Sequence, residues 1–322
     1  MNAVQSAERG VQGSFPMVSP RTRHPVLGTC VKSCVLLLLL ACIRAHGEEV
    51  EKFKVLFHNT HNYIEEGSGQ GEPKNEREKL ALFDLWREER PDILLLSEVG
   101  GRAQLEEIDG QLKKRGMDYP HVEWIEGADE VRHVVLLSRL SIAARDPHDE
   151  LSYSINGRKL EVLRGFLEVD VQVDADYRIK IYVAHLKSKM STKSSPFSGT
   201  GQSEMRLNEA RLLREKIDED LAVDPNANLL VAGDMNDTPN SKPVQLLFGS
   251  RLTDLCPLDG RGYSGTWYNK RKRRYDRIDY MFLSDGLKKE LVEGSAKLRD
   301  DKTAKLASDH FPLIAEFQAE DR

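Results

Sequence analysis

Cysteine is scarce in this sequence, with four residues among 322, which excludes a scaffold held together by disulfide bonds. The chain also lacks a Gly-Lys-Ser/Thr string, so the phosphate-binding loop of the common nucleotide hydrolases is missing. Its one pronounced apolar run, Val35–Ala41, is too short for a permanent membrane-spanning helix. A hydrophobic content of 39% is nevertheless sufficient for a large core and excludes a mainly disordered protein.

The first 47 residues have the order of a secretory signal peptide: basic residues, the apolar run, and then the small-x-small string Ala-His-Gly at positions 45–47. We therefore predict an exported protein, periplasmic or secreted, whose mature domain is residues 48–322. Two alternatives stay open, namely an uncleaved anchor helix and lipidation at Cys42, because the residues before Cys42 resemble a bacterial lipobox.

Removal of this leader would leave Cys256 as the only cysteine, so the mature chain would be held together by its core alone. It would also make the formal net charge more negative than the −5 of the whole chain, because the leader is mainly basic. An acidic protein of this kind does not coat nucleic acid through bulk charge. We expect a monomer with no stable membrane span after processing.

Short apolar runs bounded by polar or turn residues recur along the chain and predict β-strands. Two of them, Ile93–Leu96 and Leu229–Ala232, are uninterrupted, as in strands covered on both faces. By contrast, Leu167–Val173 alternates as a strand with one solvated face does. The predicted strands are Phe53–Phe57, Ile93–Leu96, Val134–Leu137, Leu167–Val173, Ile179–Ala184, Leu229–Ala232, Ile278–Leu283 and Leu313–Phe317.

Two segments have helical spacing of their apolar residues, namely 75–90, which Pro91 ends, and 204–221. The segment 187–203 is rich in Ser, Thr, Gly and Lys and is predicted to be a loop. No linker divides the mature chain and no repeat of fixed period occurs. The pattern indicates one domain of mixed α/β character.

Polar clusters stand at the ends of these apolar runs, where loops meet a sheet edge and functional sites usually form. Singly, each has an ordinary structural interpretation, such as a local salt bridge, a structural histidine or an Asx turn. The clusters are His58–Asn62, Ser97–Val99, His185–Ser188, Gly233–Pro239, Tyr275–Tyr280 and Ser308–Pro312.

Jointly, these clusters suit a hard divalent cation with oxygen ligands, and hydrolysis at phosphorus. Glu98 lies just after the apolar run Ile93–Leu96 and Ser97, where an unpaired charge is costly and a cation would neutralise it. Asp234 and Asn236 are expected to point to the same side if the strand direction persists. Asp309 and His310 are adjacent, and a nearby aspartate is expected to orient the imidazole.

Six strings in this order resemble the endonuclease/exonuclease/phosphatase superfamily, which includes exonuclease III-like nucleases, pancreatic-type deoxyribonucleases and neutral sphingomyelinases. They are His58–Asn62, Pro91–Val99, Val183–Ser188, Gly233–Pro239, Arg277–Tyr280 and Ser308–Pro312. The resemblance implies a four-layer α/β sandwich of two facing mixed β-sheets flanked by helices, as a single catalytic domain over residues 48–322. It also implies a phosphoesterase that depends on Mg²⁺ or Mn²⁺.

The same resemblance implies roles for individual residues. Glu98 matches the principal metal ligand, with Asp309 near it and Asn59 assisting. His61 stands where many relatives have an acid, which leaves open whether one or two metal ions bind.

For catalysis, the resemblance assigns Asp234 and Asn236 to the attacking water and a phosphate oxygen. His310 matches the phosphate-contacting histidine, oriented by Asp279, and His185 matches a candidate acid for the leaving group. Asp276 competes with Asp279 for the orienting role, and we prefer Asp279 because Arg-Ile-Asp-Tyr keeps the family's spacing.

The basic run Lys270–Arg274 favours a polyanionic substrate, although a solvated loop is the ordinary interpretation of such a run. We predict that Arg271, Arg273, Arg274 and Lys187 bind substrate, and that Trp267 and Tyr268 either stack on a base or belong to the core. The predicted function is phosphodiester hydrolysis in nucleic acid by in-line attack of an activated water. A lipid or small-molecule phosphoesterase and a catalytically silent binding module stay open as alternatives.

Overall fold

The computed structural model describes residues 51–68, 71–190 and 200–321. The predicted signal peptide, residues 1–47, and the alternative lipidation site Cys42 lie outside these residues, so both stay predictions. No helix in the described part of the chain is both long and apolar enough to span a membrane.

The first of two large sheets contains the amino-terminal strands and has the spatial order β15-β16-β1-β2-β4-β3. Only β1 and β2 pair in parallel, and helix α2 (Glu76–Glu89) connects them, as a parallel pair requires. The strands are β1 (Lys52–Tyr63), β2 (Ile93–Val99), β3 (His121–Ile125), β4 (His133–Ser138), β15 (Lys297–Leu298) and β16 (Leu313–Gln318).

The second large sheet repeats this plan in the order β11-β14-β10-β9-β8-β5. Here β9 and β10 are the parallel pair, and helix α4 (Thr200–Val223) connects them. The strands are β5 (Ser141–Arg145), β8 (Phe166–Gln172), β9 (Arg178–His185), β10 (Leu229–Asp234), β11 (Leu252–Asp254) and β14 (Asp279–Ser284).

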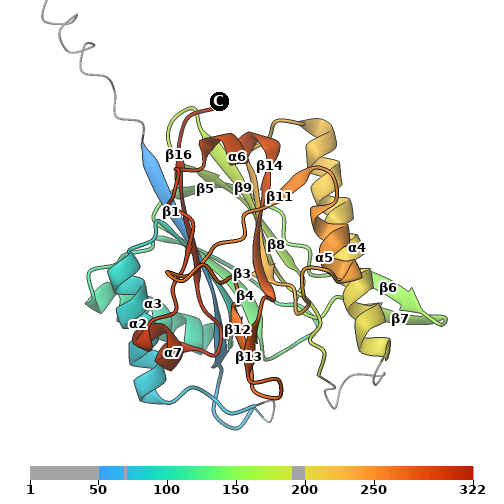
Figure 1. Ribbon diagram of the computed structural model, residues 1–322, viewed down its shortest axis with the longest axis horizontal. Helices are drawn as coiled ribbons and strands as arrows, with labels where there is room; N and C mark the ends of the chain where they lie inside the picture. Colours follow the sequence, from blue (N-terminus) through green and yellow to red (C-terminus); the bar gives the residue numbers. More distant parts are fainter. Residues whose placement is uncertain (1–50, 69–70, 191–199, 322) are drawn as a thin grey trace, which may run out of the picture. The chain divides into compact units, whose positions relative to one another are not determined.

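The remaining elements are short helices and two hairpins. They are α3 (Arg102–Lys114), α5 (Lys242–Phe248), α6 (Asp285–Glu290), α7 (Lys302–Ala307), the hairpin β6 (Ser152–Ile155) with β7 (Arg158–Glu161), and the hairpin β12 (Trp267–Asn269) with β13 (Arg274–Asp276). In Figure 1, α2, α3 and α7 cover one large sheet at the left, and α4 and α5 cover the other at the right.

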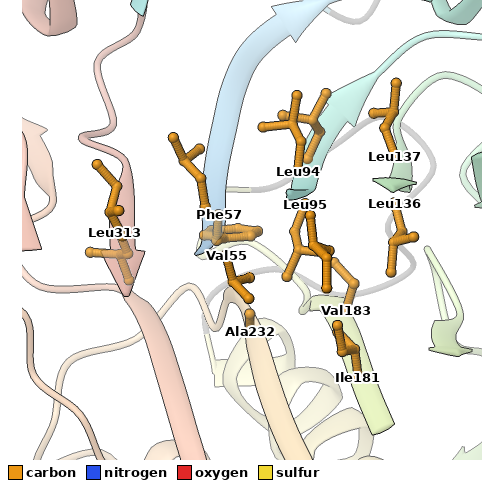
Figure 2. Close-up of a cluster of buried hydrophobic side chains, with 14 of the residues drawn as sticks. Val55, Phe57, Leu94, Leu95, Leu136, Leu137, Ile181, Val183, Ala232 and Leu313 are labelled. Atoms are coloured by element: carbon orange, nitrogen blue, oxygen red, sulfur yellow. The ribbon is translucent and has the colours of Figure 1, made fainter. Parts of the chain in front are cut away.

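The two large sheets face each other across one apolar cluster. Figure 2 shows side chains of β1 and β2, such as Phe57 and Leu95, near Ile181 and Val183 of β9 and Ala232 of β10. A second cluster joins the outer face of β9, β10 and β14 to α4 and α5. The result is the four-layer arrangement of helices, sheet, sheet and helices that the sequence predicted.

Local sequence explains the ends of α2. The side chain of Asn75 accepts from the Glu78 amide, and the Glu78 carboxylate accepts from the Asn75 amide, so two otherwise unpaired amides are satisfied. At the other end Arg90 has a left-handed backbone (φ 48°), and Pro91 excludes a further turn. This helix connects β1 to β2 and sets the spacing of two of the polar clusters.

All eight predicted strands and both predicted helices are present, with two differences. Helix α4 begins at Thr200, so it includes the end of the segment 187–203 that was predicted to be a loop. In β8, Glu168 is buried rather than solvated, because His148, Lys180 and Tyr182 donate to its carboxylate. The strict alternation of β8 therefore reflects a polar cluster covered by neighbouring side chains.

Candidate active site

The predicted site residues meet at one edge of the sandwich because of strand direction. The parallel strands place the carboxyl ends of β1 and β2, and of β9 and β10, at this edge. The antiparallel neighbours β14 and β16 begin at the same edge. Residues at or next to these strand ends are Asn59 and Glu98 in the first sheet, His185, Asp234 and Asp279 in the second, and His310, which precedes β16.

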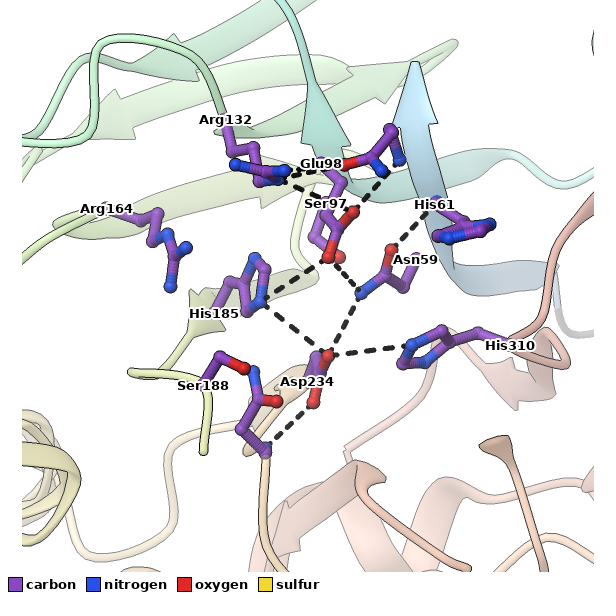
Figure 3. A network of polar contacts seen from close by, with 12 residues as sticks. Asn59, His61, Ser97, Glu98, Arg132, Arg164, His185, Ser188, Asp234 and His310 are labelled. Carbon is purple, nitrogen blue, oxygen red and sulfur yellow. Dashed lines mark hydrogen bonds and ion pairs between the residues drawn. The ribbon is translucent and has the colours of Figure 1, made fainter. Parts of the chain in front are cut away.

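One oxygen atom is the centre of this arrangement. Asp234 Oδ2 accepts a hydrogen bond from Asn59 Nδ2 at 3.0 Å, while His185 Nε2 and His310 Nε2 lie 3.7 and 4.0 Å away. Figure 3 shows these three side chains pointing towards Asp234 from three different strands or loops. The two imidazole distances exceed a good hydrogen bond, so both nitrogens can also bind an additional oxygen atom placed between them.

Glu98 is the second acid of the site, on the side of the first sheet. Its carboxylate accepts from the Asn62 amide at 2.9 Å and is 3.4 Å from Asn59 Nδ2, while Arg132 Nε lies 3.7 Å away. Asn59 thus contacts both Glu98 and Asp234, and Asp234 contacts His310. This chain of contacts through Asn59 and Asp234 places Glu98 and His310 on the same rim, as predicted.

His310 is held by Asp279, whose two carboxylate oxygens lie 2.9 and 3.0 Å from Nδ1. Burial alone would lower the pKa of His310, but the Asp279 carboxylate outweighs it, and the pKa rises to about 10. Asp276, the alternative candidate for this role, instead pairs with Lys272 and Arg274. The preference for Asp279 agrees with this geometry.

A second histidine, His58, supports the backbone of the site rather than its chemistry. Trp86 Nε1 donates to His58 Nδ1 at 3.3 Å, so the proton of a neutral ring lies on Nε2, which donates to the carbonyl oxygen of His310 at 3.1 Å. Complete burial lowers the pKa of His58 to about 3, so the ring stays neutral. This contact anchors the segment that carries His310.

Left-handed backbone conformations gather at this edge. His61, Asn62, Glu98 and Asn236 have φ values of 53°, 59°, 61° and 52°, although none is glycine. Such conformations cost about 1 kcal/mol or more each and persist where surrounding contacts hold them, as the Asn62 amide bond to Glu98 does here. These backbone conformations orient Glu98 and its neighbours towards the same edge of the sandwich.

Gly233 allows β10 to approach β9 closely. A Cβ atom at this position would lie 2.0 Å from the carbonyl oxygen of Ala184, so any other residue would push the strands apart. Strand β10 ends at Asp234, so the condition under which Asn236 was expected to share its side, namely that the strand direction persists, is not met. The Asn236 amide donates to Asp234 Oδ1 at 2.8 Å, and its side-chain Nδ2 donates to the Leu186 carbonyl at 2.9 Å.

His185 is close to both acids, and its ring is uncharged in the resting state. Complete burial lowers its pKa well below the usual value, and the nearby Arg164 adds to this effect. Within the described chain its Nδ1 has no hydrogen-bond partner. Burial is thus the main reason that the ring is neutral, and the role of His185 as an acid for the leaving group stays a prediction.

Asp309 lies at the entrance of the site. Trp267 Nε1 donates to its Oδ2 at 3.1 Å, whereas Oδ1 is buried and receives no hydrogen bond from the described residues; His61 Nδ1 is 3.4 Å away. A buried carboxylate oxygen without a donor is suited to a cation. Trp267 is thereby engaged in the site itself.

The donor set fits a hard divalent cation, with Glu98 and Asp309 as the available carboxylates. Asn59 turns its amide nitrogen towards the acids, while its oxygen accepts from the His61 amide at 2.9 Å. A ligand group also exists at Asp234, Asp279 and His310. There Asp279 already pairs with His310 Nδ1, and the expectation that Glu98 and Asp309 hold the cation stays a prediction.

The predicted substrate-binding residues divide into two groups. Arg271, Arg273 and Arg274 lie at or next to the exposed tip of the β12–β13 hairpin, although Arg274 also pairs with Asp276. The assignment of Lys187 is wrong: its side chain is 1% exposed, and Nζ donates to the carbonyls of Ser188 and Met190. Lys187 stabilises its own loop because burial leaves it no access to a ligand.

Sequence reasoning missed Asn62 and Arg132. Arg132 donates to Asn62 Oδ1 at 2.8 and 3.0 Å, which orients the loop whose amide binds Glu98. Asn62 lies within a recognised string, so its residue type was a usable signal. Arg132 lies before β4 in no recognised motif, and only the pairing of β2 with β4 brings it here.

Comparison with known proteins identifies the family of this chain. The model of the endonuclease/exonuclease/phosphatase family matches residues 66–310. Among curated proteins, no sequence matches the chain.

Solved structures share the fold. A truncated TDP2 from Caenorhabditis elegans has a TM-score of 0.57 at 20% identity, with 83% of this chain and 98% of that chain covered. The human Nocturnin catalytic domain has a TM-score of 0.60 at 17% identity, covering 84% and 95%. An endonuclease/exonuclease/phosphatase from Bacteroides vulgatus has a TM-score of 0.59 at 13% identity, covering 84% and 100%. These likenesses confirm the predicted four-layer fold.

Proposed function

Because this chain belongs to the endonuclease/exonuclease/phosphatase family, we propose that it is a divalent-metal-dependent phosphodiesterase that hydrolyses nucleic acid. The observation that supports this most directly is the convergence on Asp234 Oδ2 of Asn59, His185 and His310. Hydrolysis of a phosphodiester needs a group that orients the attacking water and donors for the phosphate oxygens, and the side chains at this edge can supply both.

Glu98 and Asp309 would hold Mg²⁺ or Mn²⁺. The bound ion supplies positive charge that offsets the charge on the phosphate oxygens. Asp309 Oδ1 receives no hydrogen bond from the described residues, and Arg132 lies near Glu98, which fits a rim where acids and cations balance.

The side chains of this chain divide the remaining work. The raised pKa of His310 keeps its ring charged at neutral pH, so Nε2 donates to a phosphate oxygen while Asp279 fixes the ring. Burial raises the pKa of Asp234, and the Asp279 carboxylate adds to this, which makes Asp234 a stronger base for the proton of the attacking water. Asn59 orients the Asp234 carboxylate.

Nucleic acid is favoured by the hairpin beside the site. The base of the β12–β13 hairpin bridges to His310 through Trp267, so the basic tip Lys270–Arg274 projects from the rim of the site. Exposed guanidinium groups in this position can bind successive phosphates of a polynucleotide.

The test is cleavage of plasmid DNA, RNA, sphingomyelin and a chromogenic phosphodiester, each with Mg²⁺ and with EDTA. We expect metal-dependent cleavage of nucleic acid, lost in Glu98→Gln and retained in the exposed control Glu293→Gln. Cleavage of sphingomyelin alone would replace nucleic acid by a lipid substrate. Cleavage that persists in EDTA, or no cleavage at all, would contradict the proposed activity.

We also propose that the protein is exported, on the basis of the leader-like residues 1–47. Mass spectrometry of the protein from the culture fluid and the membrane fraction tests this. A new amino terminus near residue 48 supports simple cleavage, a lipidated Cys42 supports an anchored form, and an intact leader on protein retained in the cytosol contradicts export.

A further inference from the structure

A cavity of about 360 Å³ lies directly beside the candidate active site and shares His61 and Asp309 with it. Three parts of the chain line it: residues of β1, of α2 and just before α2; the β12–β13 hairpin; and α7 with the residues that follow it. None of the predicted catalytic roles uses this space. Its size is that of a small-ligand pocket.

Lys74 is the feature that points to a ligand. Only 7% of the residue is exposed, and no described residue forms a hydrogen bond or an ion pair with its ammonium group. Its backbone is held, because its amide donates to the Asn62 carbonyl and the capping box of α2 follows. A buried ammonium without a partner is costly, so an anion in the cavity would stabilise it.

The acids near Lys74 have other partners. The Glu78 carboxylate accepts from the Asn75 amide, and Glu98 and Asp309 are the groups assigned to the metal ion. Lys270 and Lys305 also line the cavity, and the ammonium of Lys305 lies 5.9 Å from the Phe311 ring. The cavity therefore has an excess of positive charge once the metal site is filled.

Aromatic rings form the other part of the lining. Tyr275 stacks on Phe311 with ring centroids 4.8 Å apart, and Tyr268 packs against Tyr275 at 5.1 Å. Tyr275 is 37% exposed, so the stack supports a ring that is partly free. A planar base can stack on such a supported ring without regard to its identity.

We propose that this cavity binds the nucleoside monophosphate unit that neighbours the scissile phosphate, with Lys74 contacting its phosphate and Tyr275 stacking on its base. This inference rests on the proposed function, because it assumes a polynucleotide substrate. It gives the charged lysines and the aromatic rings of one cavity a common ligand.

Binding of thymidine 5′-monophosphate, measured by calorimetry with Mg²⁺ present so that the metal site is filled, tests the cavity in the charge state that the proposal assumes. We expect Lys74→Met to weaken binding about tenfold, because a charge-assisted contact is lost. The exposed Lys305→Met should also weaken it, and Lys288→Met, which removes the same charge outside the cavity, should not. Absence of binding by the wild type, or equal effects of Lys74→Met and Lys288→Met, would overturn the proposal.

The variant Tyr275→Leu tests the recognition of the base separately from that of the phosphate. We expect this variant to weaken thymidine 5′-monophosphate about tenfold and to leave ribose 5-phosphate, which has no base, unchanged. Equal weakening of both ligands would contradict stacking on Tyr275.

Kinetics separate this inference from the proposed function. We expect Lys74→Met to raise KM for single-stranded DNA several times more than it raises KM for bis(p-nitrophenyl) phosphate, which has no neighbouring nucleotide. If the wild type cleaves DNA but the variant changes both substrates equally, the inference fails and the function stands. If the wild type binds thymidine 5′-monophosphate but cleaves no nucleic acid, the function fails and the cavity stands.

Discussion

Two clusters in this molecule contain the same residue types, two acids and a histidine, yet they differ in what they can bind. Asp234, Asp279 and His310 lie at the edge where the strands of both sheets end, and Asp146, His148 and Glu168 lie on the outer face of the second sheet. Both have ligand atoms within 4.8 Å of one another. Geometry of the ligand atoms alone therefore does not distinguish them.

The neighbours of the central acid make the difference. The Glu168 carboxylate receives His148 Nε2 at 2.8 Å, Tyr182 hydroxyl at 2.7 Å, and the Lys180 ammonium. Although burial opposes it, these donors lower the pKa of Glu168 to about 2. Asp234 Oδ2 has one donor at hydrogen-bond distance and two imidazoles farther away. The Glu168 carboxylate therefore has all the donors it needs, whereas the Asp234 carboxylate has room for a substrate group.

The largest expected effect separates the two clusters by activity. Asp234→Asn should lower kcat by about 10²–10⁴-fold, because it removes a base positioned for the attacking water. Glu168→Gln, a matched change in the other cluster, should leave activity close to that of the wild type. Steady-state rates on DNA with Mg²⁺ measure both. Equal loss in the two variants would show that the clusters do not differ in function.

The next effect concerns the charge on His310. Asp279→Asn should lower kcat about tenfold or more and move the alkaline limb of the pH profile towards neutral pH. In the proposed mechanism His310 donates as the protonated ring, so activity should be lost as the pH rises through its pKa, which is about 10 with Asp279 present. Rates from pH 6 to pH 10 check this. An unchanged alkaline limb would exclude His310 as the titrating group.

A smaller effect is expected on stability, in the Glu168 cluster. Glu168→Ala should reduce the free energy of unfolding by about 2 kcal/mol at neutral pH, because three donors lose their acceptor. Since the folded pKa of Glu168 is depressed to about 2, this stabilisation is present above about pH 4.5 and is lost as the pH falls towards 2. Urea unfolding at pH 7 and pH 3 measures it. A difference that does not shrink in acid would contradict the ion-pair origin.

The smallest effect is stabilisation by metal. Mn²⁺ at ten times its dissociation constant should stabilise the folded protein by about 1.4 kcal/mol relative to EDTA. Asp309→Asn should abolish this gain, and Asp146→Asn, in the cluster that Lys180 already neutralises, should retain it. Thermal unfolding with and without Mn²⁺ provides the measurement. Loss of the gain in Asp146→Asn would place the ion in the other cluster.

Much of the site was predictable because its residues follow recognisable strands. Glu98 comes after four apolar residues and Asp234 after another such run, and each run ends at the same edge once it pairs in parallel with its neighbour. Asp279 precedes an apolar run instead, and its strand runs antiparallel to β10, so it reaches the same edge from the other direction. Local pattern and pairing rules suffice for these positions.

Other residues were not predictable because their surroundings come from distant segments. Lys187 looked like part of an exposed basic loop, but α4 and the residues after β9 enclose it. His185 looked like a proton donor, but burial and Arg164 keep it neutral. Lys74 carried no motif at all, and its lack of a partner is visible only when α7 and the β12–β13 hairpin close around it.

By itself, the order of apolar runs and polar strings determined the strands, the family and the identity of most polar residues at the active edge, because these depend on residue type and local spacing. The tertiary structure alone decided which of those residues are charged, which are satisfied by neighbours and which remain open to a ligand. The physical reason is that residues from distant parts of the chain bury each carboxylate or imidazole and donate hydrogen bonds to it. These neighbours set the charge of the group and decide whether it can still bind a ligand.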